Sequence, residues 1–99
     1  MRHEFHPEAL LEFEDAVQFY KERGRALGRR FAGEVRTTIA KTVATPERWR
    51  VLEQDVRVCR ARVFPYAVLY TIELDHILII AVAHDKRRPG YWRHRLTTP

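Results

Sequence analysis

The chain has 99 residues, a formal net charge of +5 and a single cysteine, Cys59. With 45% hydrophobic and 31% charged residues it can form a folded core, which argues against wholesale disorder. The lone cysteine excludes an internal disulfide framework and a cysteine-based zinc site. No apolar run approaches the ~20 residues of a membrane span, and no signal-peptide stretch follows Met1. We therefore expect a cytoplasmic protein with a single domain over residues 1–99.

The N-terminal half predicts a short strand and then two helices. Residues 2–6 fit an edge strand, and Pro7 suits the first turn of a helix. Apolar residues then recur at helical spacing in two runs, which end at Gly24 and before Pro46. The first run is Leu10, Phe13, Val17 and Tyr20, and the second is Leu27, Phe31, Val35, Ile39 and Val43. A short connection over residues 21–26 makes the pair an antiparallel hairpin.

The second half predicts strands. Residues 47–55 read as a loop that carries Trp49, and from Val56 the apolar period changes to two. Residues 66–72 are rich in strand-forming side chains, and a hairpin turn at 73–76 leads to a nearly continuous apolar run over 77–83. The predicted fold class is α+β: an N-terminal strand, an antiparallel helix hairpin and a three-strand antiparallel meander, in the order βααβββ.

The positive charge is concentrated after residue 56. Residues 1–56 hold ten basic and ten acidic side chains, whereas residues 57–99 hold eight basic and three acidic ones. The segment after the last strand, His84 to Arg95, adds two adjacent aromatic residues to this basic region. It fits phosphate contacts with base stacking, or a protein interface. The alternatives are a hydrated basic face and a charged tail with Trp92 packed back on the sheet.

Three segments resemble toxins of the RelE/ParE family from type II toxin–antitoxin systems. They are Phe5-His6-Pro7-Glu8-Ala9, the run VFPYAVLY at 63–70 and the run IAVAHDKRRPGYW at 80–92. The resemblance implies a growth-inhibiting toxin that a cognate antitoxin neutralises by wrapping an extended or helical segment over it, in a heterotetramer or larger complex. It implies no metal, cofactor or membrane. From the charge asymmetry we expect acidic antitoxin residues opposite the C-terminal basic face.

The family divides by target, and the residues fit its two branches unequally. RelE-like members cut mRNA on the ribosome without metal, which requires a base, positive charge around the phosphate and support for the leaving oxygen. If the chain is RelE-like, its catalytic candidates are Arg60, Arg62, His84, Arg87 and Tyr91. However, the arginine expected three residues before Tyr70 is Ala67 here. His84 is also open to a structural reading, as the residue that finishes the last strand.

ParE-like members poison DNA gyrase and have no nuclease chemistry, and the alanine at position 67 favours this branch. Its target-binding candidates are Arg57, Arg60, Arg62, Lys86, Arg87, Arg88, Tyr91 and Trp92. Arginine and aromatic side chains are common anchors of protein interfaces. Tyr91 and Trp92 are equally open to a packing role. A third alternative is an inactive member that only binds its antitoxin.

Overall fold

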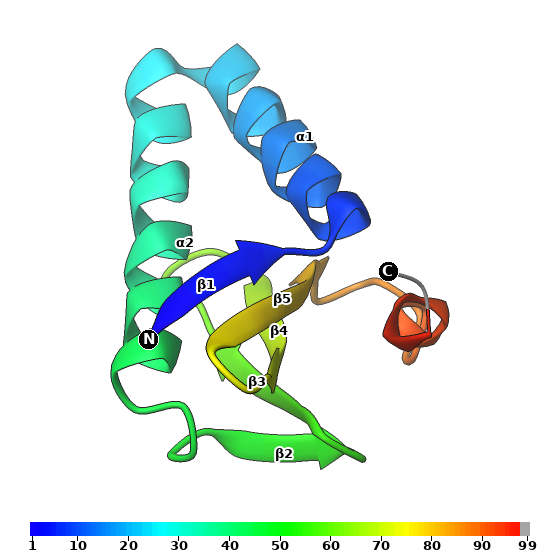
Figure 1. The fold of residues 1–99 in the computed structure, drawn as a ribbon. Helices are drawn as coiled ribbons and strands as arrows, with labels where there is room; N and C mark the ends of the chain where they lie inside the picture. The colour runs from blue at the N-terminus through cyan, green and yellow to red at the C-terminus, as the bar shows by residue number, and fades with distance from the viewer. Residues whose placement is uncertain (98–99) are drawn as a thin grey trace.

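The computed structural model describes residues 1–97 and gives an α+β fold (Figure 1). Its elements are β1 (Arg2–Phe5), α1 (Pro7–Arg23), α2 (Arg25–Ala44), β2 (Arg50–Glu53), β3 (Val56–Arg60), β4 (Tyr66–Ile72), β5 (His76–His84) and a 3₁₀ turn, η1 (Arg93–Leu96). The predicted fold class is confirmed. No helix among residues 1–97 is long and apolar enough to cross a membrane.

The sheet is mixed and has the strand order β1-β5-β4-β3-β2. Strand β1 pairs with β5 in parallel, and the other neighbours are antiparallel. The prediction of a loop over 47–55 was wrong for Arg50–Glu53, which forms β2, so the meander has four strands. Periodicity did not reveal β2 because Val51 and Leu52 are both more than 40% exposed and the strand forms by pairing with β3.

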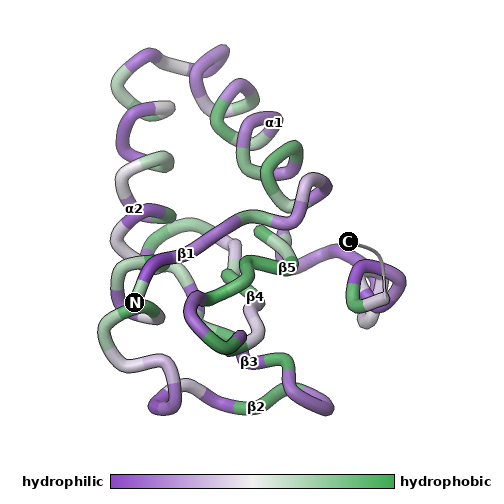
Figure 2. The backbone as a smooth tube through the Cα atoms, in the orientation of Figure 1, coloured by the Kyte–Doolittle hydropathy of each residue, from purple (hydrophilic) through white to green (hydrophobic). Residues whose placement is uncertain are grey.

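Both faces of the sheet are covered. The two helices pack on one face, around Phe31, Val68, Tyr70 and Ile79. Trp92 closes a second cluster on the other face, which we call the tail face. The apolar character of β5, green in Figure 2, follows from this double coverage. The predicted stripe on α1 was partly wrong, because Leu10 is 39% exposed and the buried residues are Ala9, Phe13 and Ala16.

The two helices approach closely at Gly28. Alanine substitutions at Gly28 and at Gly33 are therefore expected to change the free energy of unfolding in opposite directions. A Cβ at Gly28 would lie 2.9 Å from Lys21 Cα, whereas one at Gly33 meets nothing within 4 Å. We expect Gly28→Ala to lower the free energy of unfolding by about 1–3 kcal/mol through overpacking. Gly33→Ala should raise it by roughly 0.5–1 kcal/mol, because alanine is the better helix former. Urea denaturation of both variants checks this, and a Gly28→Ala protein as stable as Gly33→Ala would contradict the packing.

His6 caps α1 and makes stability depend on pH. Its Nδ1 accepts the Glu8 backbone N–H at 3.1 Å, which requires an unprotonated nitrogen. Burial lowers the pKa of His6 below its usual value. Below about pH 6.5, His6 therefore binds a proton more readily in the unfolded chain than in the folded chain. The free energy of unfolding falls as the pH decreases. We expect the urea midpoint to drop between pH 7.5 and 5.5, and to drop less in His6→Asn, which caps without titrating. Equal drops in both proteins would exclude His6 as the cause.

Candidate target-binding surface

Two loops meet at the end of the sheet where β5 terminates. The Asp85 backbone N–H donates to the Pro65 carbonyl at 2.9 Å, which joins the β3–β4 loop to the segment after β5. Arg60 Nη2 lies 2.8 Å from Asp85 Oδ2, so an ion pair also crosses the beginning of β4, the strand between them. The hydrogen bond from Arg60 lowers the pKa of Asp85. We call residues 60–65 and 85–90 together the sheet-end surface.

The sheet-end surface carries unpaired positive charge. Arg62, Lys86 and Arg88 are exposed, and none of the three forms an ion pair with a residue in the range 1–97. Val63 follows Arg62 in the chain, is 70% exposed and has a φ of +73°, a conformation that is strained for a β-branched residue. Such strain clusters at functional sites. The two segments of the sheet-end surface therefore present exposed cations and one exposed apolar side chain.

Arg57 does not join this surface. It lies opposite Tyr70 in the β3–β4 register, whereas Arg60 lies opposite Ala67, and positions three apart on a strand face opposite sides of the sheet. The Arg57 guanidinium instead donates to the backbone carbonyls of Glu47 and Trp49, at 3.0 and 2.7 Å. The structure thus brings the segment that carries Arg60 and Arg62 against the segment that carries Lys86 and Arg88, with Asp85 as the point of contact, and places Arg57 with the helix face and the loop before β2.

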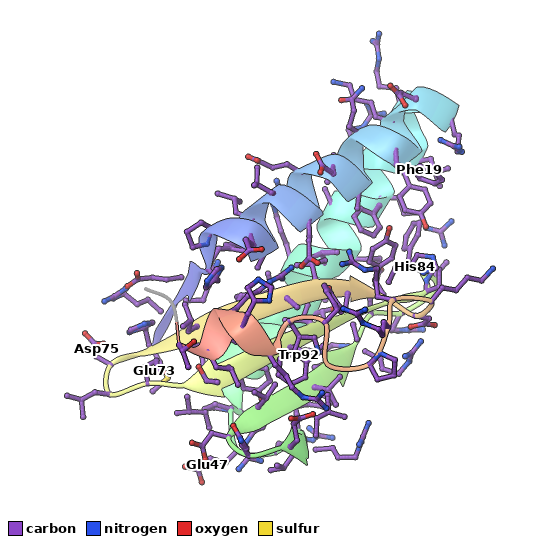
Figure 3. All side chains as sticks on the ribbon, turned by 90° about the vertical axis from the view of Figure 1, so that its right-hand side faces the viewer. Phe19, Glu47, Glu73, Asp75, His84 and Trp92 are labelled. Carbon is purple, nitrogen blue, oxygen red and sulfur yellow. The ribbon has the colours of Figure 1, made fainter. Side chains whose placement is uncertain are left out.

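Tyr91 and Trp92 pack on the tail face. In Figure 3 the segment after β5 turns back across the strands, with His84 at the strand end and Trp92 on the returning segment. The Trp92 side chain is 3% exposed and packs with Val56, Ala67 and Leu69. The Tyr91 hydroxyl donates to Glu12 Oε2, and burial together with this hydrogen bond raises the pKa of Tyr91.

The Glu12 carboxylate holds the returning segment to α1 and β5. Its Oε1 accepts the Val82 backbone N–H and Arg95 Nη1, at 3.1 and 2.7 Å. Its Oε2 accepts Arg95 Nη2 at 3.1 Å as well as the Tyr91 hydroxyl. The side chains of Glu12 and Arg95 are only 14% and 5% exposed. Sequence reasoning missed both residues, although the position of Glu12 beside Phe13 on the buried side of α1, between Ala9 and Ala16, was a signal of a buried acid.

His84 and Arg87 separate two cavities. One, of about 280 Å³, lies on the tail face and is also lined by Ala67 and Tyr91. The other, of about 330 Å³, lies between α1 and the sheet and is also lined by Phe19. His84 Nδ1 accepts the Lys86 backbone N–H at 3.0 Å, which places the proton of the neutral ring on Nε2. The Arg87 guanidinium stacks 3.8 Å from the Tyr91 ring centroid and lies 3.7 Å from Glu12.

Residues 1–97 contain no group of three or more His, Cys, Asp or Glu side chains placed to hold a metal ion. Among the C-terminal cations, Arg60 is paired with Asp85, Arg93 with Glu53, and both Arg87 and Arg95 with Glu12.

Comparison with models of known protein families finds a match to this chain. Residues 3–89 match the model described as the ParE toxin of the type II toxin–antitoxin system, parDE. The chain belongs to the ParE toxin family. A search of curated proteins finds no match. The ParE match spans both helices, the sheet and the sheet-end surface up to Pro89, and it ends before Tyr91 and η1. A ParE toxin acts with a cognate antitoxin, so this chain is the toxin component of such a pair.

Proposed function

We propose that this ParE-family toxin inhibits growth by poisoning DNA gyrase, and that the sheet-end surface contacts the target. Arg60, Arg62, Lys86, Arg87 and Arg88 would supply the positive charge of that contact. Exposed Val63 would supply an apolar anchor, since interfaces concentrate their binding energy in a few packed side chains surrounded by polar ones. Tyr91 and Trp92 would act indirectly by holding the returning segment on the sheet, whereas Arg57, bonded to the loop before β2, would take no part in the contact.

The observation that supports a binding function over RNA cleavage is the chemistry of the tail-face cavity. Ala67, 6% exposed, lines it where a RelE-like nuclease is expected to carry an arginine. Loss of one such charge-stabilising group typically lowers a rate by about 10²–10³. The Tyr91 hydroxyl is bonded to Glu12, and Arg60 is bonded to Asp85. His84 Nδ1 accepts the Lys86 backbone N–H and Arg87 is paired with Glu12, so four of the five groups that would act on a scissile phosphate already have partners within the chain.

A ribosome-dependent endoribonuclease is the second candidate function. His84 and Arg87 line the same cavity as Tyr91, and a ring with its proton on Nε2 beside a guanidinium is a combination that acid–base cleavage of RNA can use. An inactive member that only pairs with its antitoxin is the third.

Expression of the chain without its antitoxin separates the three candidates. Gyrase poisoning predicts growth arrest with accumulation of gyrase–DNA cleavage complexes and intact mRNA. The nuclease predicts arrest with cleaved mRNA, and Arg87→Ala should then abolish the cleavage. The inactive member predicts no arrest. Arg62→Glu with Arg88→Glu should suppress arrest in the first case, whereas Arg48→Glu with Arg50→Glu, on the far edge of the sheet, should not.

The antitoxin is proposed to dock at the open edge of β1. β1 is an edge strand, and beside it lies a mainly apolar groove of about 480 Å³. Phe5, Phe13, Ile39 and Val43 line it, together with His3 and Arg36. An extended segment can pair with the edge and place alternate side chains in such a groove. We expect Ala40→Glu, a charge placed in the groove, to weaken antitoxin binding at least tenfold by titration calorimetry. Thr37→Glu, also exposed on α2 but not lining the groove, should leave it unchanged; equal effects would exclude this site.

A further inference from the structure

The helix hairpin carries a cationic groove. The net charge of this part of the sequence does not indicate it. The groove lies between α1 and α2 and has a volume of about 670 Å³. Four of its lining residues are basic and none is acidic; the basic ones are Lys21, Arg25, Arg29 and Arg36. Residues 1–56 nevertheless sum to zero charge. The sum misleads because several of the balancing acids are held elsewhere: Glu8 and Glu12 bind the returning C-terminal segment, and Glu53 binds Arg93.

The arginines form one row along α2. Positions 25, 29 and 36 fall within about 40° of arc on a helix with 3.6 residues per turn, and they span about 16 Å along its axis. Lys21 faces the same groove from α1. All four side chains are exposed, and none forms an ion pair with any residue among 1–97. The joined ends of the helices project beyond the sheet in Figure 1, so a long partner can lie along the hairpin.

The shape of the groove indicates what kind of partner it fits. Its other lining residues are Val17, Gly28 and Ala32, and no exposed large apolar side chain lies in it. A protein helix that docks tightly needs apolar anchors, which this floor provides only weakly. A nucleic acid backbone needs a row of cations, and nucleic acid interfaces are more polar and more positive than protein interfaces. Arginine also matches phosphate with two parallel hydrogen bonds.

We propose that this groove binds the sugar–phosphate backbone of duplex DNA through Lys21, Arg25, Arg29 and Arg36. A rigid duplex presents one negative charge per about 1.7 Å of its axis, so a straight cationic row of this length meets several phosphates. The floor residues Gly28 and Ala32 are buried, so the four exposed cations would make the contact. The contact is independent of base sequence, and it does not require gyrase to be the target of the toxin.

The test is a titration of a fluorescently labelled 20-base-pair duplex with the full chain, followed by anisotropy. Four phosphate contacts predict a slope of about −3.6 in log K against log salt, or roughly 100-fold weaker binding at 200 mM than at 50 mM salt. The variant Arg25→Gln/Arg29→Gln/Arg36→Gln should bind at least tenfold more weakly and with a slope reduced by about 3. The matched control Arg30→Gln/Arg48→Gln/Arg50→Gln loses the same charge and should stay within threefold of the unmodified chain.

Three outcomes would overturn the proposal. The first is equal duplex affinity in the groove variant and the control variant. The second is a groove variant that loses antitoxin binding but keeps duplex binding, which would make the groove a protein site. The third is tighter binding of a single-stranded RNA of the same length than of the duplex. The titration contains no gyrase, so its failure is distinguishable from failure of the proposed gyrase poisoning.

Discussion

Glu12→Ala is expected to lower the free energy of unfolding by about 3–5 kcal/mol, because it leaves the buried Arg95 guanidinium without its counter-charge. The substitution also removes the acceptor for the Val82 backbone N–H and the Tyr91 hydroxyl. A loss of this size is a large part of the 5–15 kcal/mol that holds a typical domain folded. The C-terminal segment would then detach from α1 or the whole chain would unfold.

Urea denaturation followed by far-UV circular dichroism measures this loss. Glu14→Gln is the matched control, since Glu14 is an exposed acid on the same helix and should change stability by less than about 0.5 kcal/mol. Glu12→Leu combined with Arg95→Met should recover part of the loss, because two apolar side chains replace a broken ion pair. If Glu12→Ala lowers the free energy of unfolding no more than Glu14→Gln does, the hydrogen bonds and ion pair of Glu12 do not stabilise the fold.

Trp92→Ala should be similarly damaging, at about 3–5 kcal/mol, because it empties the centre of the tail-face cluster. Trp92 is the large aromatic side chain of that cluster, and it packs against β-sheet residues that would otherwise face water. Its loss both removes buried apolar area and leaves a cavity above Ala67 and Leu69.

The same denaturation experiment tests this expectation, with Leu74→Ala as the control. Leu74 is fully exposed at the β4–β5 turn, so its truncation should have almost no effect. A Trp92→Ala protein that unfolds at the urea concentration of the unmodified chain would show that the segment after β5 does not hold the sheet. In that case Trp92 would be available to a partner as an exposed anchor.

The sequence was sufficient to predict the helices and strands whose regularly spaced apolar residues are buried. The second helix shows this best: Phe31, Val35 and Ile39 recur at helical spacing and are all buried. Strand β5 was predicted from its apolar run and is covered on both faces. Strand β2 could not be predicted in the same way, because its apolar residues are exposed and its pairing with β3 decides its structure.

The site was predictable only in part, because spacing along the chain does not show which charges meet. Arg60 and Asp85 are 25 residues apart and form an ion pair, whereas Arg57 and Arg60 are neighbours on one strand and face opposite sides. The role of Glu12 depends on Arg95, 83 residues away. The N-terminal half shows the same difference between sequence and structure. Its charges sum to zero along the chain, but α2 carries a row of unpaired arginines.

The central claim, that this toxin acts on gyrase through its sheet-end surface, is most directly tested by DNA supercoiling with purified gyrase. We predict that the chain inhibits supercoiling and accumulates cleaved DNA covalently bound to gyrase, and that Arg62→Glu/Arg88→Glu inhibits at least tenfold less well than Arg48→Glu/Arg50→Glu. Unimpaired supercoiling at toxin concentrations that arrest growth would contradict the account, as would equal inhibition by the two double variants.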